Sequence, residues 1–520
     1  MWFYYQYRRI RKAVEEPLKD RLPPPAGTLL ESANEECQDS HVESHPDELV
    51  TELHSHDHVG DIDAHRWYKA TKWMSTLVLC LILTTVAFAT AISAGVVTPV
   101  SKEFGVPEEV DVLATAMFLW GFGTGSLVTG PFSETCGRTP VFVVTLALFM
   151  VCIALAGSAR GLAQQVIFRF LAGFFGSIPW VCAGGSISDL WTSEERVYIF
   201  PVCAVISFVG STIAPVAGGY LTRNNISWRW GDWITVIATG VCLFIVVLCL
   251  PETFRPILLK VKTRVIHART QAELFHKLTI VTGGSPTLGR QLIQGLYRPF
   301  ILAIYEPIVL LFTWYIALIY IVLFTSLNGY TFVFGNIYGF DPAQVGLCFL
   351  PMLVGNSCVL LLIPYANTLY RRDLDHARGR AKQHNENNDR KHAEDSQYID
   401  MDSVTPPPES HLYYAMFGAP FIPIALFCMA YTARPEVSHW YLMACYGIWS
   451  ASALATVNFL RSMFSGGMMM ASMPMYKNIG VMWSLTIMAI AAAVMTPVPY
   501  AFYWWGPVVR RWSRHADKGT

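Results

Sequence analysis

The sequence predicts an all-α membrane protein, and three observations lead to that fold class. Eleven apolar stretches of about 20 residues, the length at which a helix crosses the hydrocarbon core, follow one another between Trp73 and Arg511. Apolar residues make up 53% of the 520 residues, and charged residues only 15%, against about a quarter in soluble domains. The charges are concentrated outside these stretches. Because a helix pairs its backbone polar groups within one segment, each stretch is expected to be a helix.

The first 72 residues predict a cytoplasmic, largely disordered tail. A basic cluster at 8–12 follows the aromatic start, which argues against a cleavable signal peptide. The run HSHDH, with His54, His56 and His58, could bind a transition metal. It stands alone in a segment whose composition is typical of disorder, so we expect neither a metal site nor a cofactor.

Six spans form the expected N-terminal bundle, 73–252, at 73–97, 112–130, 140–157, 165–185, 200–221 and 234–250. A basic loop, 253–299, follows, and its first half has the apolar and basic faces of an amphipathic helix on the inner leaflet. The C-terminal bundle, 300–505, has five stretches, at 300–324, 345–365, 414–431, 440–475 and 481–502. It contains a charged loop, 366–411, that is expected to be disordered and cytoplasmic. Residues 506–520 form a cytoplasmic tail.

The distribution of basic residues predicts that both termini are cytoplasmic. With the N-terminus inside, thirty Lys and Arg residues lie on the cytoplasmic side and five on the other, as the positive-inside rule requires. Two cytoplasmic termini need an even number of crossings, whereas eleven stretches are recognised. The stretch 440–475 is too short for two spans and a turn, which need more than about 40 residues. We therefore expect that one helix is absent from this chain.

The run GPFSETCGRTP joins the second and third stretches and carries Gly130, Glu134, Gly137 and Arg138. It resembles the signature loop of the major facilitator superfamily. Glycines permit a tight turn, and a carboxylate beside an arginine at two helix ends can form an ion pair that holds one conformation closed. The alternative is an ordinary membrane-surface turn with one arginine. The later run SDLWTSEER, with Asp189 and Arg196, supports the same resemblance.

Arg169 and Glu306 are the candidates for proton coupling. Arg169 lies inside the fourth stretch, where an arginine is costly unless it faces a polar interior, and the resemblance implies a role in coupling. Its alternative is a side chain that extends to the membrane surface. Glu306, beside Pro307 at the start of the seventh stretch, is the best acidic candidate for protonation or cation contact; an interfacial glutamate is the alternative.

The fifth stretch contains the run VGSTIAPVAGGYL, which resembles the antiporter motif of drug exporters in the same superfamily. Its small residues, four apart, allow helices to approach closely, and its proline favours a bend. The residues concerned are Gly210, Ala214, Pro215, Gly218 and Gly219.

Together these motifs resemble fungal twelve-span drug:proton antiporters of the polyamine and cycloheximide type over about residues 65–515. The resemblance implies a major facilitator fold of two six-helix halves. In that family a tenth helix stands where Trp440 here runs straight into Tyr441. We therefore predict a deletion at this junction.

The function expected from the resemblance is proton-coupled export of a small amphipathic or cationic compound, such as a drug, polyamine, toxin or secondary metabolite. The partners would be that compound, protons and the bilayer, with no nucleic acid, and the protein would be a monomer of the plasma membrane. An enzyme is not expected, because no set of His or carboxylate groups converges within the stretches. The alternatives are a transport-inactive splice form or gene-model product, and a membrane receptor that does not transport.

Overall fold

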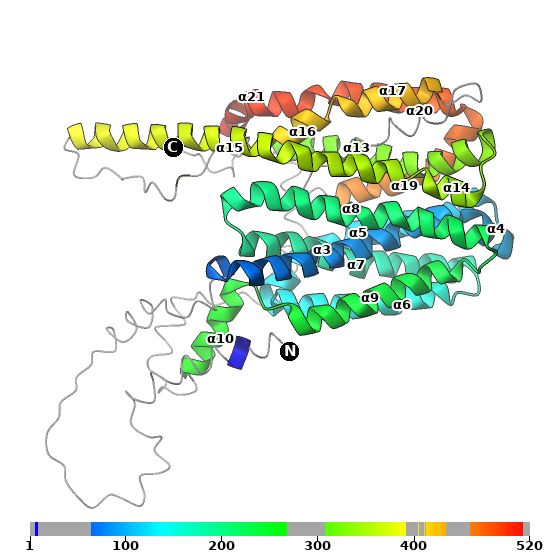
Figure 1. The fold of residues 1–520 in the computed structure, drawn as a ribbon, viewed down its shortest axis with the longest axis horizontal. Helices are drawn as coiled ribbons and strands as arrows, with labels where there is room; N and C mark the ends of the chain where they lie inside the picture. The colour runs from blue at the N-terminus through cyan, green and yellow to red at the C-terminus, as the bar shows by residue number, and fades with distance from the viewer. Residues whose placement is uncertain are drawn as a thin grey trace, which may run out of the picture.

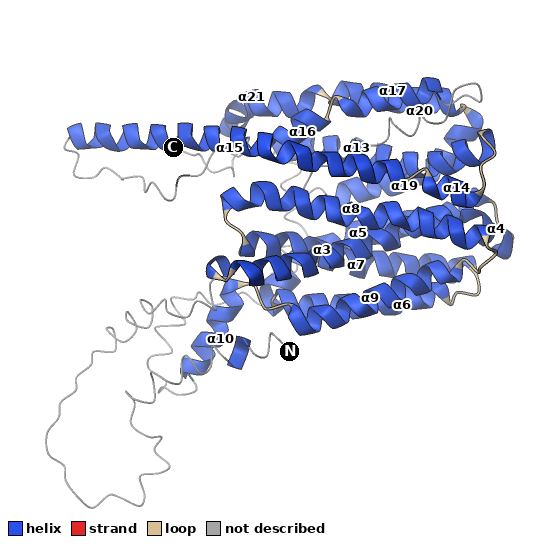
Figure 2. Cartoon of the chain, viewed as in Figure 1, coloured by secondary structure: helices blue, strands red, loops and turns tan. Residues whose placement is uncertain are grey.

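The computed structural model describes residues 6–8, 64–267, 307–391, 404, 410, 412–432 and 458–512. These residues form helices and turns, and the described part contains no strand. Nine described helices are long and apolar enough to cross a membrane. The long helices lie side by side in one layered bundle (Figures 1 and 2).

Six long helices build the first half of the bundle (Figure 1). They are α3 (Lys69–Ala91), α5 (Glu108–Cys136), α6 (Arg138–Gly157), α7 (Leu162–Leu190), α8 (Ser193–Arg223) and α9 (Arg229–Cys249). The short helix α4 (Val97–Phe104) lies at one end, which we call the α4 face, and α10 (Arg255–His267) extends from the other, the α10 face. Alternate connections therefore lie on opposite faces, as in an up-and-down bundle.

The second half begins with α13 (Pro307–Phe332), which ends in a π-helical turn, η3 (Val333–Ile337). It continues with α14 (Pro342–Leu347), α15 (Leu350–Lys391), α16 (Tyr413–Gly418), α17 (Phe421–Thr432), α19 (Asn458–Asn478), α20 (Val481–Met495) and α21 (Pro497–Trp512). The seventh span was expected at 300–324, but the described helix continues to Phe332, and residues 300–306 lie outside the described part.

α15 differs from the expected disorder of 366–411. It continues as one helix to Lys391, well beyond the expected end of the span. Low apolar content shows that this extension is exposed, but its Arg, Lys, Ala and Gln residues are good helix formers. Near its middle, Arg378 forms an ion pair of 3.2 Å with Glu194 of α8. The amphipathic helix expected in 253–299 corresponds to α10, while 268–299 lies outside the described residues.

α17 and α19 run in the same direction, from the α10 face toward the α4 face (Figure 1). Contacts show that α19 is parallel to α13: Trp314, early in α13, packs on Phe464, and Phe332, late in α13, packs on Tyr476. Between Thr432 and Asn458 the chain lies outside the described residues. The predicted loss of a tenth helix at Trp440 falls on this connection, outside the described residues, and stays a prediction.

Two helices of the first half, α5 and α8, make the main contacts with the second half. α5 packs on α19, where Trp120 Nε1 donates to Met463 O at 3.1 Å. α8 packs on α14 and α15, where Asn356 Nδ2 donates to Val205 O at 2.9 Å. At the α4 face, Arg223 and Asp341 add an exposed ion pair of 3.2 Å.

Candidate functional site

A buried ion pair joins α7 and α9 inside the first half. Arg169 Nη2 lies 2.5 Å from Asp232 Oδ1, and the two side chains are only 4% and 2% exposed. Arg169 Nη1 also donates to Ala89 O of α3 at 3.1 Å, so one guanidinium ties three helices together. This burial argues against the alternative in which Arg169 extends to the membrane surface. Burial of such a charge is costly unless a close counter-charge compensates for it, as Asp232 does here.

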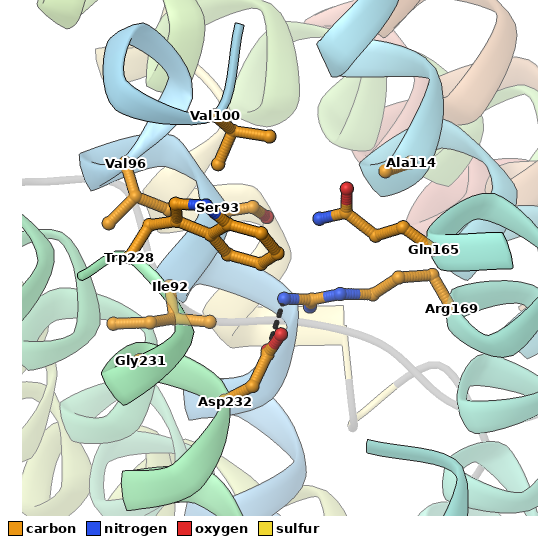
Figure 3. Close-up of a pocket in the computed structure, with 10 residues that line it drawn as sticks. All are labelled: Ile92, Ser93, Val96, Val100, Ala114, Gln165, Arg169, Trp228, Gly231 and Asp232. Atoms are coloured by element: carbon orange, nitrogen blue, oxygen red, sulfur yellow. Dashed lines mark hydrogen bonds and ion pairs between the residues drawn. The ribbon is translucent and has the colours of Figure 1, made fainter. Parts of the chain in front are cut away.

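A small cavity lies directly beside this pair (Figure 3). Its volume is about 10 Å³, enough for about one water molecule. Gln165, one turn before Arg169 on α7, also lines it, and Trp228 forms the opposite wall. Gln165 Oε1 and Asp232 Oδ2 are buried and have no hydrogen-bond partner among the described residues. The cavity therefore presents acceptor groups and an ion pair that could exchange a proton with water.

The cavity is closed toward the α4 face by a second set of contacts. Trp228, 3% exposed, donates its Nε1 hydrogen to Glu103 Oε2 of α4 at 2.5 Å. Arg229 pairs with the other oxygen of Glu103 at 2.7 Å and donates to Gly157 O and Ala159 O. The Arg229 hydrogen bond lowers the pKa of Glu103, so this carboxylate stays charged and holds α4 against α9.

A charge cluster at the α10 face joins α6, α7 and the segment that follows α9. Arg138 Nε pairs with Asp189 of α7 at 3.2 Å, and its guanidinium lies over the Phe254 ring. Glu252, fully buried after α9, accepts from the backbone N–H groups of Arg138 and Thr139 at 2.9 and 3.1 Å. Burial raises the pKa of Glu252, and these backbone hydrogen bonds oppose that rise.

Close packing explains why glycine precedes Arg138. Gly137 has a φ of +94°, which other residues rarely adopt, and a Cβ there would lie 2.8 Å from Glu252 Oε2. The turn between α5 and α6 is thus closed over the Glu252 carboxylate.

The remaining predicted residues of this motif lie apart from the cluster. Glu134 is exposed on α5, and the carboxylates that face Arg138 are instead Asp189 and Glu252. A Cβ at Gly130 would contact nothing. Arg196 donates within the first turn of α8, to Ser193 Oγ at 2.9 Å. Glu306 and the run His54 to His58 lie outside the described residues, and the described residues contain no group that could hold a metal.

The predicted antiporter motif lines two tight contacts of α8. A Cβ at Gly210 would lie 2.1 Å from Thr84 O, and one at Gly218 would lie 2.9 Å from the Cα of Gly95, both in the first half. Ala214 is fully buried against Ala91 and Ile92. Gly219 faces the other half, where a Cβ would lie 2.3 Å from Pro342 O of α14, and Pro215 is buried on the same helix. Small residues thus set the distance between the halves at the α4 face.

Sequence reasoning missed three acidic residues: Glu103, Asp232 and Glu252. Asp232 lies just before the apolar stretch 234–250, and the demand of a buried Arg169 for a counter-charge was the available signal. Glu252 belongs to the run PETF, where burial could not be inferred from the sequence.

Comparisons with known proteins agree with this fold. The family model described as Major Facilitator Superfamily matches residues 77–460. The MFS-type transporter kojT of Aspergillus flavus is 36% identical over 473 residues, which cover 86% of this chain and 80% of that protein. The citrinin biosynthesis cluster MFS transporter mrr1 of Monascus ruber is 28% identical, covering 86% and 89% of the two chains. A solved structure of a peptide transporter POT variant with alafosfalin has a TM-score of 0.52 at 12% identity, covering 88% of this chain and 99% of that one. The chain therefore belongs to the Major Facilitator Superfamily and is a membrane transporter.

Proposed function

We propose that this transporter exports a small amphipathic organic compound from the cytoplasm in exchange for protons, and that Arg169 and Asp232 carry the coupling. The observation that carries the proposal is the buried Arg169–Asp232 pair beside a cavity of water size. An ionisable pair held away from solvent in a membrane bundle is a functional site by default, because its burial is costly.

The coupling step follows from the charges at this site. A proton that reaches Asp232 neutralises its carboxylate and removes the attraction that holds α9 to Arg169. The guanidinium is then left as a buried charge without a partner, a state of high free energy. Movement that rehydrates Arg169 or returns the proton relieves this cost. Proton binding thereby favours a second arrangement of the helices.

The contacts between the halves suggest where that second arrangement differs. At the α4 face, Gly219 and Pro342 approach closely and Arg223 pairs with Asp341. At the α10 face, Arg138 and Asp189 pair within the first half, while Glu194 pairs with Arg378 of the second. Alternating access of a repeat-built transporter requires one set of contacts to open while the other closes.

The proposed direction of transport and the proposed class of substrate rest on other observations. The excess of Lys and Arg supports a cytoplasmic position for the α10 face and both termini, and the plasma membrane is the proposed location. Relatives such as mrr1 are named for biosynthesis clusters of fungal metabolites, which supports a small organic substrate. A cationic substrate, the other class expected from the sequence, would have relied on Glu306, outside the described residues. We propose that the protein acts as a monomer.

Inside-out membrane vesicles test this proposal. Vesicles containing the transporter would receive a defined mixture of cationic, neutral and anionic amphipathic compounds, with accumulation measured by mass spectrometry. At least one compound should accumulate while the pH gradient is present and stop when an uncoupler collapses it. Accumulation that survives the uncoupler contradicts proton coupling. A chain that accumulates nothing would be the transport-inactive form or the receptor considered above.

A further inference from the structure

Arg461 is a second buried arginine, in the second half of the bundle. It lies on α19 and is 3% exposed, with its guanidinium carbon 3.9 Å from the centroid of the Tyr320 ring on α13. Its Nε has no hydrogen-bond partner among the described residues. The Tyr320 ring stabilises the cation through its face, but it does not neutralise it.

The described residues of the second-half helices around Arg461 include no carboxylate that pairs with it. The sequence has no Asp or Glu from 307 to 340 or from 437 to 516, so α13, α19, α20 and α21 hold none. Among the described acids of the second half, Asp341 pairs with Arg223 at the α4 face, and Asp373 accepts from the Tyr413 hydroxyl. Glu306, which directly precedes α13, lies outside the described residues. Arg461 thus differs from Arg169, whose counter-ion is built into the neighbouring helix.

Other polar groups in the contact between α13 and α19 do have partners. Asn328 Nδ2 donates to Ser472 Oγ at 2.9 Å, and the Tyr476 hydroxyl donates to Thr325 O at 3.1 Å. These two side chains are thus paired, whereas Thr325 Oγ1, also buried on α13, has no partner among the described residues. A buried arginine without a counter-charge is costly and is expected only where it has a function.

The position of Arg461 places it beside the seam between the halves. Two residues further along α19, Met463 O accepts from Trp120 of α5. A Cβ at Gly466 would lie 2.7 Å from the Trp120 ring, so α19 and α5 are in close contact here. The Arg461 side chain leaves α19 on the side of α13, not on the side of α5. Access to it from a central path therefore requires that separation of the halves also loosen the contact between α13 and α19.

We propose that Arg461 and Tyr320 form the subsite that binds the anionic group of the substrate. This inference rests on the proposed function, because the site becomes accessible only if the halves separate. The N–H donors of a guanidinium lie in its own plane, so a ring over its face leaves them free to donate. Two neighbouring N–H groups form a fork that can bind both oxygens of a carboxylate or sulfonate. The substrate class is therefore an amphipathic organic anion, whose charge supplies the counter-ion that the helices lack.

Binding of naphthalene-2-sulfonate to the purified full chain in detergent micelles tests this assignment. Naphthalene-2-sulfonamide has the same ring system and no charge, so the ratio of the two dissociation constants reports the contribution of the anion. The native chain should bind the sulfonate at least about tenfold more tightly, a difference of about 1.4 kcal/mol. Arg461→Gln should abolish this preference. Arg160→Gln, which removes an exposed arginine from the turn between α6 and α7, should preserve it.

Two further variants keep the test decisive if Arg461→Gln does not fold. Arg461→Lys retains the charge but not the paired N–H donors, so the preference for the sulfonate over the sulfonamide should fall without vanishing. Tyr320→Leu removes the ring that lies over the guanidinium and should weaken sulfonate binding. An unchanged preference in these variants, or a native chain that does not prefer the sulfonate, overturns the assignment. Binding needs no pH gradient. A native preference that depends on Arg461 therefore stands even if vesicle transport proves independent of protons, an outcome that refutes only the coupling.

Discussion

Replacing Asp232 with asparagine tests whether the pair of Arg169 and Asp232 only stabilises the fold or also couples transport to protons. The substitution leaves the Arg169 guanidinium 4% exposed without a counter-charge. Breaking a buried pair from one side costs about 3–5 kcal/mol, so the free energy of unfolding in mixed micelles should fall by that amount. The matched control is Asp341→Asn, which breaks the exposed Arg223 pair at the α4 face. That change should cost less than about 1 kcal/mol.

A double variant distinguishes loss of stability from loss of coupling. Arg169→Met with Asp232→Leu replaces the pair by apolar groups, a change that is often neutral or stabilising. Its free energy of unfolding should return to near the native value, while proton-dependent accumulation in vesicles stays absent. The reasoning is refuted if Asp232→Asn unfolds like the native chain, or if the double variant still couples transport to protons.

Three other predictions concern packing, the α10-face cluster and chain length. Gly219→Ala places a Cβ 2.3 Å from a backbone oxygen of the other half, so it should weaken the contact between the halves at the α4 face by about 1–3 kcal/mol. Distances between spin labels on the two halves should increase at this face. The control is Gly184→Ala, whose Cβ would meet open space and should leave these distances unchanged. Burial raises the pKa of Glu252 above 4.5, so protonation of this side chain stabilises the folded chain. That stabilisation is complete below pH 4.5 and is lost as pH rises through the higher pKa of the folded state. Glu252→Gln should therefore reduce the change of the thermal unfolding midpoint with pH, whereas Glu134→Gln, at an exposed position, should leave it unchanged. The messenger RNA should encode about 20 further apolar residues in the region that links α17 to α19. A messenger RNA that encodes Tyr441 directly after Trp440 would disprove the deletion.

The sequence predicted the helical membrane fold because about 20 apolar residues determine one span without reference to any other part of the chain. It also identified Arg169, since an arginine inside such a stretch must find a polar environment. Its partner was not predictable, because Asp232 is 63 positions away and the contact depends on how α7 packs on α9. The same reason applies to Glu252, which reaches Arg138 across 114 positions.

The disorder expected after residue 366 shows a second reason why part of the fold could not be predicted from the sequence. A charged segment without a core-facing pattern does not predict a docked helix, and the α15 extension contacts α8 through Tyr370 and Arg378. Those contacts join residues from the two halves. The packing of the halves thus adds to the helix propensity of the segment.

The account depends most directly on proton movement through Asp232. Once a substrate is identified from the vesicle mixture, its addition to vesicles containing a pH-sensitive dye measures proton flux alongside substrate flux. The native chain should move protons in a fixed ratio to substrate, and Asp232→Asn should abolish the proton flux. Substrate movement without protons in the native chain, or an unchanged proton flux in Asp232→Asn, would contradict the account.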